Sequence, residues 1–308
     1  MAFPENSYVL FCYGDEWYSV RELLIEAIAV RQYNSFTPYW TRRQLLGFGV
    51  AGIISPIAVS QISNCLKRNL LIMGSSKQAS SSAAEGRLLS RPTHPTATAS
   101  PGLHPLGLDG QRDGFVYVPK TYQADRPAPL VLMLHGAGGD ASGGLNILRR
   151  LADPFETILL AVDSRSSTWD IIRGRYGSDI AFIDRALAQT FSRYAIDPSR
   201  IAIAGFSDGA SYALSVGITN GDLFTHVIAF SPGFMAPARQ EGKPRLFISH
   251  GKWDTVLPIE RCSRRIVPQL QRAGYDVQYR EFNGLHTVPD AIAREALEWF
   301  TEAAPKGN

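Results

Sequence analysis

Short apolar runs alternate with longer amphipathic segments over the last two thirds of this chain. Each run has the length of a buried strand, and Ile180, Ile183 and Leu187 recur at the steps of three and four typical of a helix. The predicted strands are 115–118, 130–134, 158–162, 201–204, 226–230, 245–249 and 277–282, and the predicted helices are 178–194, 207–219, 259–273 and 290–303. This alternation predicts an α/β fold with a mostly parallel central sheet and helices on both faces. The short connection between Phe230 and Arg245 predicts that the fold carries no large cap domain.

The first 110 residues lack this alternation. Residues 75–102 are rich in Ser, Ala, Thr and Pro and hold few large apolar side chains, a composition that cannot bury enough surface to offset the entropy of ordering. We therefore expect three parts: an N-terminal extension over 1–74, a flexible linker over 75–110 and a catalytic domain over 111–308.

The extension contains a pattern typical of bacterial export signals. Arg42 and Arg43 precede an uncharged stretch over 48–62, and Cys65 closes a weak lipoprotein-like box. Residues 41–65 therefore favour export to the periplasm or membrane over a cytoplasmic location, with transient membrane association through this segment. The alternative is a buried or amphipathic helix. Residues 1–40 precede the arginines, whereas an export signal normally starts near the N-terminus. Either these residues are a real extension, or translation begins after Met1.

Composition excludes several classes of function. The net charge is only +3 and basic residues form no stripe with interleaved aromatic residues, so nucleic-acid binding is not expected. The three cysteines are scattered, and no His/Cys cluster has the spacing of metal ligands. We expect neither a metal nor a cofactor.

The candidate chemistry centres on the pentapeptide 205–209, Gly-Phe-Ser-Asp-Gly, between an apolar run and a predicted helix. Flanking glycines permit the tight strand-to-helix turn that exposes a nucleophilic serine, here Ser207. The alternative is a serine that only caps the helix. An acid and a base follow in the order that a nucleophile elbow requires: Asp254 lies 47 residues after Ser207, and His286 lies 32 residues after Asp254. Both follow predicted strands, at the rim of a parallel sheet where sites form.

Four segments together resemble the phospholipase/carboxylesterase branch of the α/β-hydrolases, close to dienelactone hydrolases and polyhydroxybutyrate-depolymerase-like esterases. They are 135–139 (His-Gly-Ala-Gly-Gly), 205–209, 250–258 and 284–286. The resemblance covers residues 112–302. It implies a serine hydrolase of carboxylic esters with Ser207 as nucleophile, Asp254 as orienting acid and His286 as base. Asp208 stands where the most familiar members carry Gln, a difference that bears on substrate more than on reaction.

Other positions receive subsidiary roles. The backbone N–H groups of Ala137 and Asp208 are the expected oxyanion donors. Trp169 is expected to line the cleft and contact the substrate, with a packed Trp as the alternative, and His135 and His250 are expected to be structural. The expected substrate is a small or surface-accessible ester. A serine peptidase of the same fold and a non-catalytic binding protein remain alternatives, the latter disfavoured because all three candidate catalytic residues are in place.

Overall fold

The computed structural model describes residues 10–13, 16–19, 81–95 and 100–302 and divides the chain into two units, residues 1–69 and 70–308. In the first unit, β1 (Leu10–Tyr13) and β2 (Glu16–Ser19) pair as an antiparallel hairpin. The predicted export segment, 41–65, lies outside the described residues. Within the described part of the chain, no helix is long and apolar enough to span a membrane.

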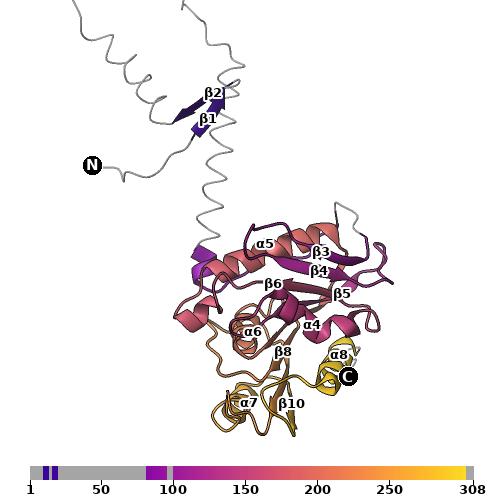
Figure 1. The fold of residues 1–308 in the computed structure, drawn as a ribbon, viewed down its shortest axis with the longest axis vertical. Coiled ribbons are helices and arrows are strands. Elements are labelled where there is room, and N and C mark those ends of the chain that lie inside the picture. Colours follow the sequence, from indigo (N-terminus) through magenta and orange to yellow (C-terminus); the bar gives the residue numbers. More distant parts are fainter. Residues whose placement is uncertain (1–9, 14–15, 20–80, 96–99, 303–308) are drawn as a thin grey trace, which may run out of the picture. The chain divides into compact units, whose positions relative to one another are not determined.

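An eight-stranded sheet forms the centre of the second unit (Figure 1). In spatial order its strands are β10 (Val277–Phe282), β9 (Arg245–Gly251), β8 (His226–Phe230), β7 (Ile196–Phe206), β5 (Ala128–Leu134), β6 (Ile158–Val162), β4 (Gly114–Val118) and β3 (Gly102–Pro105). The six strands from β10 to β6 are parallel, whereas β4 and β3 add an antiparallel edge. The predicted α/β architecture with a mostly parallel sheet is confirmed.

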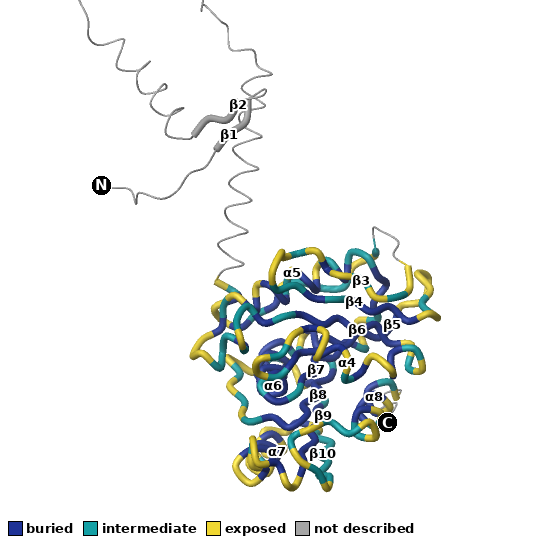
Figure 2. Tube along the Cα trace, viewed as in Figure 1, coloured by how far each residue is buried: buried dark blue, intermediate teal, exposed yellow. Residues whose placement is uncertain are grey.

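Helices cover both faces of this sheet, so its central strands are fully buried (Figure 2). The helical elements are α4 (Ala141–Ala152), the 3₁₀ helix η1 (Asp170–Arg173), α5 (Ser178–Arg193), α6 (Asp208–Thr219), α7 (Ser263–Arg272) and α8 (Asp290–Thr301). Helices α5, α6 and α7 pack on the face to which Leu130 and Leu132 point, and α4 and α8 pack on the face of Val131 and Met133. The two-residue alternation along β5 thus supplies both cores.

Two elements that the sequence pattern did not predict are held by local contacts. Helix α4 begins with poor helix formers, Ser142, Gly143 and Gly144. The Asp140 side chain caps it by accepting a hydrogen bond of 2.7 Å from the Gly143 amide. Strand β3 contains Gly and Pro, residues that weaken a strand but are tolerated at the edge of a sheet.

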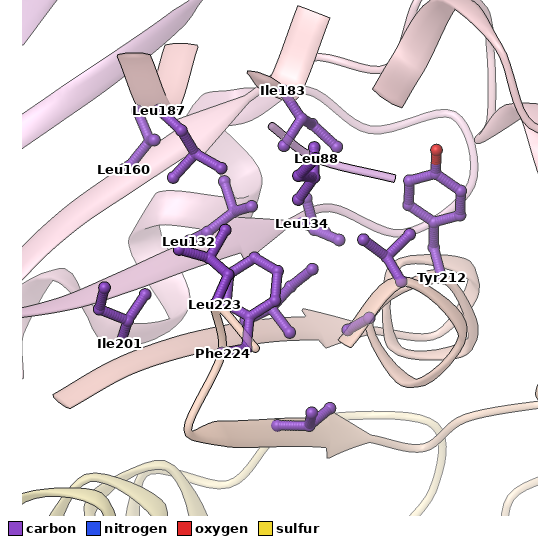
Figure 3. Close-up of a cluster of buried hydrophobic side chains, with 14 of the residues drawn as sticks. Leu88, Leu132, Leu134, Leu160, Ile183, Leu187, Ile201, Tyr212, Leu223 and Phe224 are labelled. Carbon is purple, nitrogen blue, oxygen red and sulfur yellow. The ribbon is translucent and has the colours of Figure 1, made fainter. Parts of the chain in front are cut away.

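The prediction of a flexible linker over 75–110 is wrong for much of that range. The described residues between 81 and 110 pack on the domain that follows them. Leu88 is fully buried, in the same cluster as Leu134 and Ile183 (Figure 3). Its backbone amide donates to Asn220 Oδ1 at 2.9 Å. Next to it, the Arg87 guanidinium makes two hydrogen bonds of 2.8 Å to the Asp222 carboxylate. A few well-placed side chains therefore order a segment whose average composition indicated flexibility.

Two adjacent leucines test this packing. We expect Leu88→Ala to lower the free energy of unfolding by about 2–5 kcal/mol, because it leaves a cavity in the core. Leu89 is 46% exposed, so Leu89→Ala should change the free energy of unfolding by no more than about 0.5 kcal/mol. Denaturant unfolding of the full chain measures both. Small effects of equal size would show that the segment behaves as a linker.

Candidate active site

Ser207 occupies a sharp turn between β7 and α6. Its backbone has φ 58° and ψ −121°, a left-handed conformation that costs a non-glycine residue roughly 1–3 kcal/mol. The Ser207 amide donates to the Phe230 carbonyl at 2.9 Å, which ties the turn to the end of β8. A Cβ on Gly205 would lie 2.2 Å from the Gly209 carbonyl oxygen, so the turn closes only because these residues are glycines.

The Ser207 hydroxyl meets an imidazole from the loop after β10. Ser207 Oγ lies 2.8 Å from His286 Nε2, and His286 Nδ1 lies 2.6 Å from Asp254 Oδ2. Because a carboxylate only accepts, Nδ1 carries the proton and Nε2 is left to accept from the serine hydroxyl. This is the arrangement in which a histidine can remove the hydroxyl proton.

The carboxylate of Asp254 is buried and held on both oxygens. Oδ1 accepts hydrogen bonds from the backbone amides of Val256 at 2.9 Å and Leu257 at 2.8 Å. Oδ2 faces His286 and also lies 3.2 Å from His250 Nε2. These contacts fix the carboxylate within its own loop, so His286 meets an acid whose orientation is already set.

The loop that carries Asp254 and the loop that carries His286 are also joined through their backbones. The Trp253 amide donates to the Gly284 carbonyl at 3.0 Å. A Cβ on Gly251 would lie 2.4 Å from the Leu285 carbonyl oxygen, so this close approach requires glycine. The two loops therefore form one rigid unit beside the nucleophile.

The loop after β5 supplies the other wall of the site. The position of a Cβ on Gly136 is 3.4 Å from Ser207 Cβ, so backbone lies directly against the nucleophile. No hydrogen bond joins the backbone amides of Ala137 or Asp208 to any residue that the structure describes. Two free N–H groups beside a nucleophile are the requirement for an oxyanion site.

The His135 side chain helps to hold this loop in place. Its Nδ1 lies 2.7 Å from the Gly136 carbonyl, and its Nε2 accepts from the Ser164 amide at 3.0 Å. The carbonyl fixes the proton on Nδ1, and burial lowers the pKa of His135, so the imidazole is neutral. The predicted structural role agrees with these contacts.

A cleft of about 430 Å³ opens beside His286. It is lined by the loop after β5, by the first turns of α4, by Phe206 and by residues 286–288. The open end of the oxyanion loop therefore faces a space large enough for a small molecule. Among the described residues, no group of three His, Cys, Asp or Glu side chains could hold a metal ion.

Comparisons with known proteins agree with this geometry. A family model described as phospholipase/carboxylesterase matches residues 155–299. The crystal structure of esterase PE8 superposes with a TM-score of 0.51 at 23% identity, covering 62% of this chain and 98% of that chain. A Staphylococcus aureus fluorophosphonate-binding serine hydrolase, FphF, has a TM-score of 0.53 at 15% identity, covering 67% of this chain and 100% of that one. This chain has the α/β-hydrolase fold.

In sequence, this chain resembles esterases. It is 27% identical over 169 residues to a protein named probable feruloyl esterase C from Aspergillus oryzae, a match covering 52% of this chain and 60% of the relative. The corresponding Aspergillus flavus protein is 26% identical over the same coverage. The chain thus spans about 60% of the length of these curated relatives. The expected resemblance to esterases of the α/β-hydrolase fold is confirmed.

Trp169 does not line the cleft, contrary to the prediction. It is fully buried, and its indole N–H donates to the His135 carbonyl at 2.9 Å. Its ring stacks on Tyr212 with centroids 5.0 Å apart. The alternative, a packed Trp, describes this residue.

Sequence reasoning also missed residues that support the site. The Thr168 hydroxyl donates to Asp208 Oδ2 at 2.6 Å, although the segment around Thr168 offered no periodic signal. Ser211 accepts from the Gly233 amide at 2.9 Å and its hydroxyl lies 3.2 Å from the Ser207 carbonyl. The sequence signal that could have identified Ser211 is its position one helical turn after Ser207. These contacts hold Asp208, the residue after Ser207, and the Ser207 carbonyl.

Gly209 offers a direct test of the turn. A Cβ there would lie 2.4 Å from the carbonyl oxygens of Leu134 and His135, so Gly209→Ala should lower the free energy of unfolding by about 1–3 kcal/mol. A Cβ on Gly143 would meet Asp140 Oδ1 at an ordinary 3.5 Å, and Gly143→Ala should be neutral or stabilise by up to about 1 kcal/mol. Denaturant unfolding of both variants measures the difference. Equal stability of the two would contradict the close approach of α6 to β5.

Proposed function

We propose that this protein cleaves carboxylic esters by transferring the acyl group to Ser207. The observation that carries the proposal is the continuous relay from Asp254 Oδ2 through His286 to Ser207 Oγ, with contacts of 2.6 and 2.8 Å. A binding protein on this fold would not need such a relay. The sequence likeness to esterases supports an ester as substrate.

The first step forms the acyl-enzyme. Ser207 Oγ attacks the ester carbonyl carbon while His286 Nε2 takes the hydroxyl proton. Asp254 stabilises the resulting imidazolium, and the tetrahedral intermediate collapses by breaking the bond to the alcohol oxygen. His286 returns the proton to that oxygen, and the alcohol leaves.

Water completes the cycle. His286 removes a proton from a water molecule that attacks the acyl carbon, and the carboxylic acid leaves as Ser207 recovers its proton. The backbone amides of Ala137 and Asp208 donate to the carbonyl oxygen in both tetrahedral intermediates, where its negative charge develops. The reaction consumes only the ester and water.

The cleft guides the choice of substrate. Its volume, about 430 Å³, suits the small acyl or alcohol group of an ester that reaches the site from solvent. The phospholipase/carboxylesterase description and the feruloyl esterase names of relatives support a carboxylic ester and leave the acyl group open. Export through residues 41–65 stays a prediction from the sequence.

A fluorophosphonate probe tests the function, because it labels only a serine that is activated as a nucleophile. We expect one label on the wild-type protein and none on Ser207→Ala, which should also lose turnover of p-nitrophenyl acetate by about 10⁴-fold or more. Ser211→Ala removes a serine from the same helix and should still be labelled. Labelling of Ser207→Ala, or its near wild-type turnover, would show that another group carries the reaction.

A further inference from the structure

One oxygen of the Asp254 carboxylate lies between two imidazoles. Oδ2 is 2.6 Å from His286 Nδ1 and 3.2 Å from His250 Nε2. Each imidazole contacts a serine through its other nitrogen: His286 Nε2 lies 2.8 Å from Ser207 Oγ, and His250 Nδ1 lies 2.7 Å from Ser263 Oγ. The acid is therefore centred in a chain of five side chains, of which the proposed reaction uses only three.

The proton of His250 is placed by its neighbours. Its Nε2 lies 2.7 Å from the Leu257 carbonyl, which can only accept, so Nε2 carries the proton and Nδ1 accepts from the Ser263 hydroxyl. His250 is fully buried, and burial lowers its pKa, so the ring is neutral. The uncharged ring thus donates its N–H to the Leu257 carbonyl, with the carboxylate oxygen 3.2 Å from the same nitrogen.

These two contacts act on one short loop. The Leu257 amide donates to Asp254 Oδ1, while the Leu257 carbonyl accepts from His250. His250 therefore holds the far end of the turn that carries the carboxylate, and its Nε2 also lies 3.2 Å from Oδ2. Helix α7, through Ser263, anchors the ring from the opposite side.

The other ionisable groups near His250 are accounted for. On β10, Glu281 is its register partner, and that carboxylate is paired at 2.7 Å with Arg264 of α7. Cys262 at the start of α7 is buried, and burial raises the pKa of its thiol. Asp254 and His286 are therefore the groups whose charge changes would be felt at His250.

We propose that His250, held by Ser263, is a positioning residue that fixes the Asp254 carboxylate and, through it, the hydrogen bond between Asp254 and His286. This inference rests on the proposed acyl transfer to Ser207. His250 touches neither substrate nor the reacting atoms and acts through Asp254 alone.

The sign of the effect follows from the dipole. The His250 N–H withdraws negative charge from Oδ2, which weakens the attraction between the carboxylate and the His286 imidazolium. Loss of that N–H strengthens this attraction. Only neutral His286 can act as a base. Without the N–H, the acid limb of the profile, which is the fall of kcat/KM at low pH, is therefore expected at higher pH.

The test measures kcat, KM and the pH profile of p-nitrophenyl acetate hydrolysis, normalised to active enzyme by fluorophosphonate titration. His250→Phe fills the space without a donor, and we expect kcat to fall about 10- to 100-fold, with KM little changed and the acid limb at higher pH. His250→Gln places an amide donor near the former Nε2 and should recover most of kcat. Ser263→Ala removes the hydrogen bond to Nδ1 while the Leu257 carbonyl still holds the proton on Nε2, so kcat should fall by less than in His250→Phe.

His226→Phe is the matched control. His226 is a buried histidine at the start of β8, where it packs against Trp299 and Phe300, and burial lowers its pKa to about 4. Its replacement should change the melting temperature without moving the acid limb.

Several outcomes would overturn the inference. One is a His250→Phe enzyme whose kcat, per active site, is within twofold of wild type and whose pH profile is the same as that of wild type. Another is a His250→Phe enzyme whose acid limb lies at lower pH than that of wild type. If His250→Phe does not fold, His250→Gln and Ser263→Ala decide. A His250→Gln enzyme whose kcat stays about 10- to 100-fold below wild type, or a Ser263→Ala enzyme with unchanged kcat, contradicts the role. A wild-type protein that takes no fluorophosphonate label would instead contradict the proposed function, which keeps the two failures distinct.

Discussion

The close approach of helix α6 to the end of strand β5 is the constraint on which the site depends. Gly209 touches the Leu134 and His135 carbonyls where a Cβ would lie only 2.4 Å away. This contact makes the nucleophile and the oxyanion loop parts of one packed block. The block holds Ser207 at a positive φ that an isolated turn would relax, so the hydroxyl meets His286 without reorganisation.

A second block carries the acid and the base. Gly251 and Trp253 tie the loop after β9 to the loop after β10, and His250 holds the acid loop from within the core. Both blocks lie at the carboxyl ends of neighbouring parallel strands, where residues distant in sequence converge. In the proposed reaction, Ser207 and His286 therefore come from two units whose separation the sheet fixes.

The apolar runs were sufficient to predict most of the fold, since a buried parallel strand is a continuous apolar segment; 158–162 and 226–230 match β6 and β8 at both ends. Strand β3 and helix α4 were missed because a sheet edge and an aspartate cap, more than propensity, hold them. Chain order was enough to choose Ser207, Asp254 and His286 as candidates. The burial of Trp169 and of Leu88 depends on contacts far apart in sequence, which no local pattern encodes.

The acyl-enzyme itself is the most direct test of the account. A bulky ester such as p-nitrophenyl pivalate should slow deacylation, and acid quenching within the burst should preserve the adduct. Mass spectrometry should then find one pivaloyl group on the tryptic peptide of residues 201–239, with fragments placing it on Ser207, and the adduct should disappear as substrate is exhausted. Sustained hydrolysis with no adduct, or with the pivaloyl group on another residue, would contradict acyl transfer to Ser207.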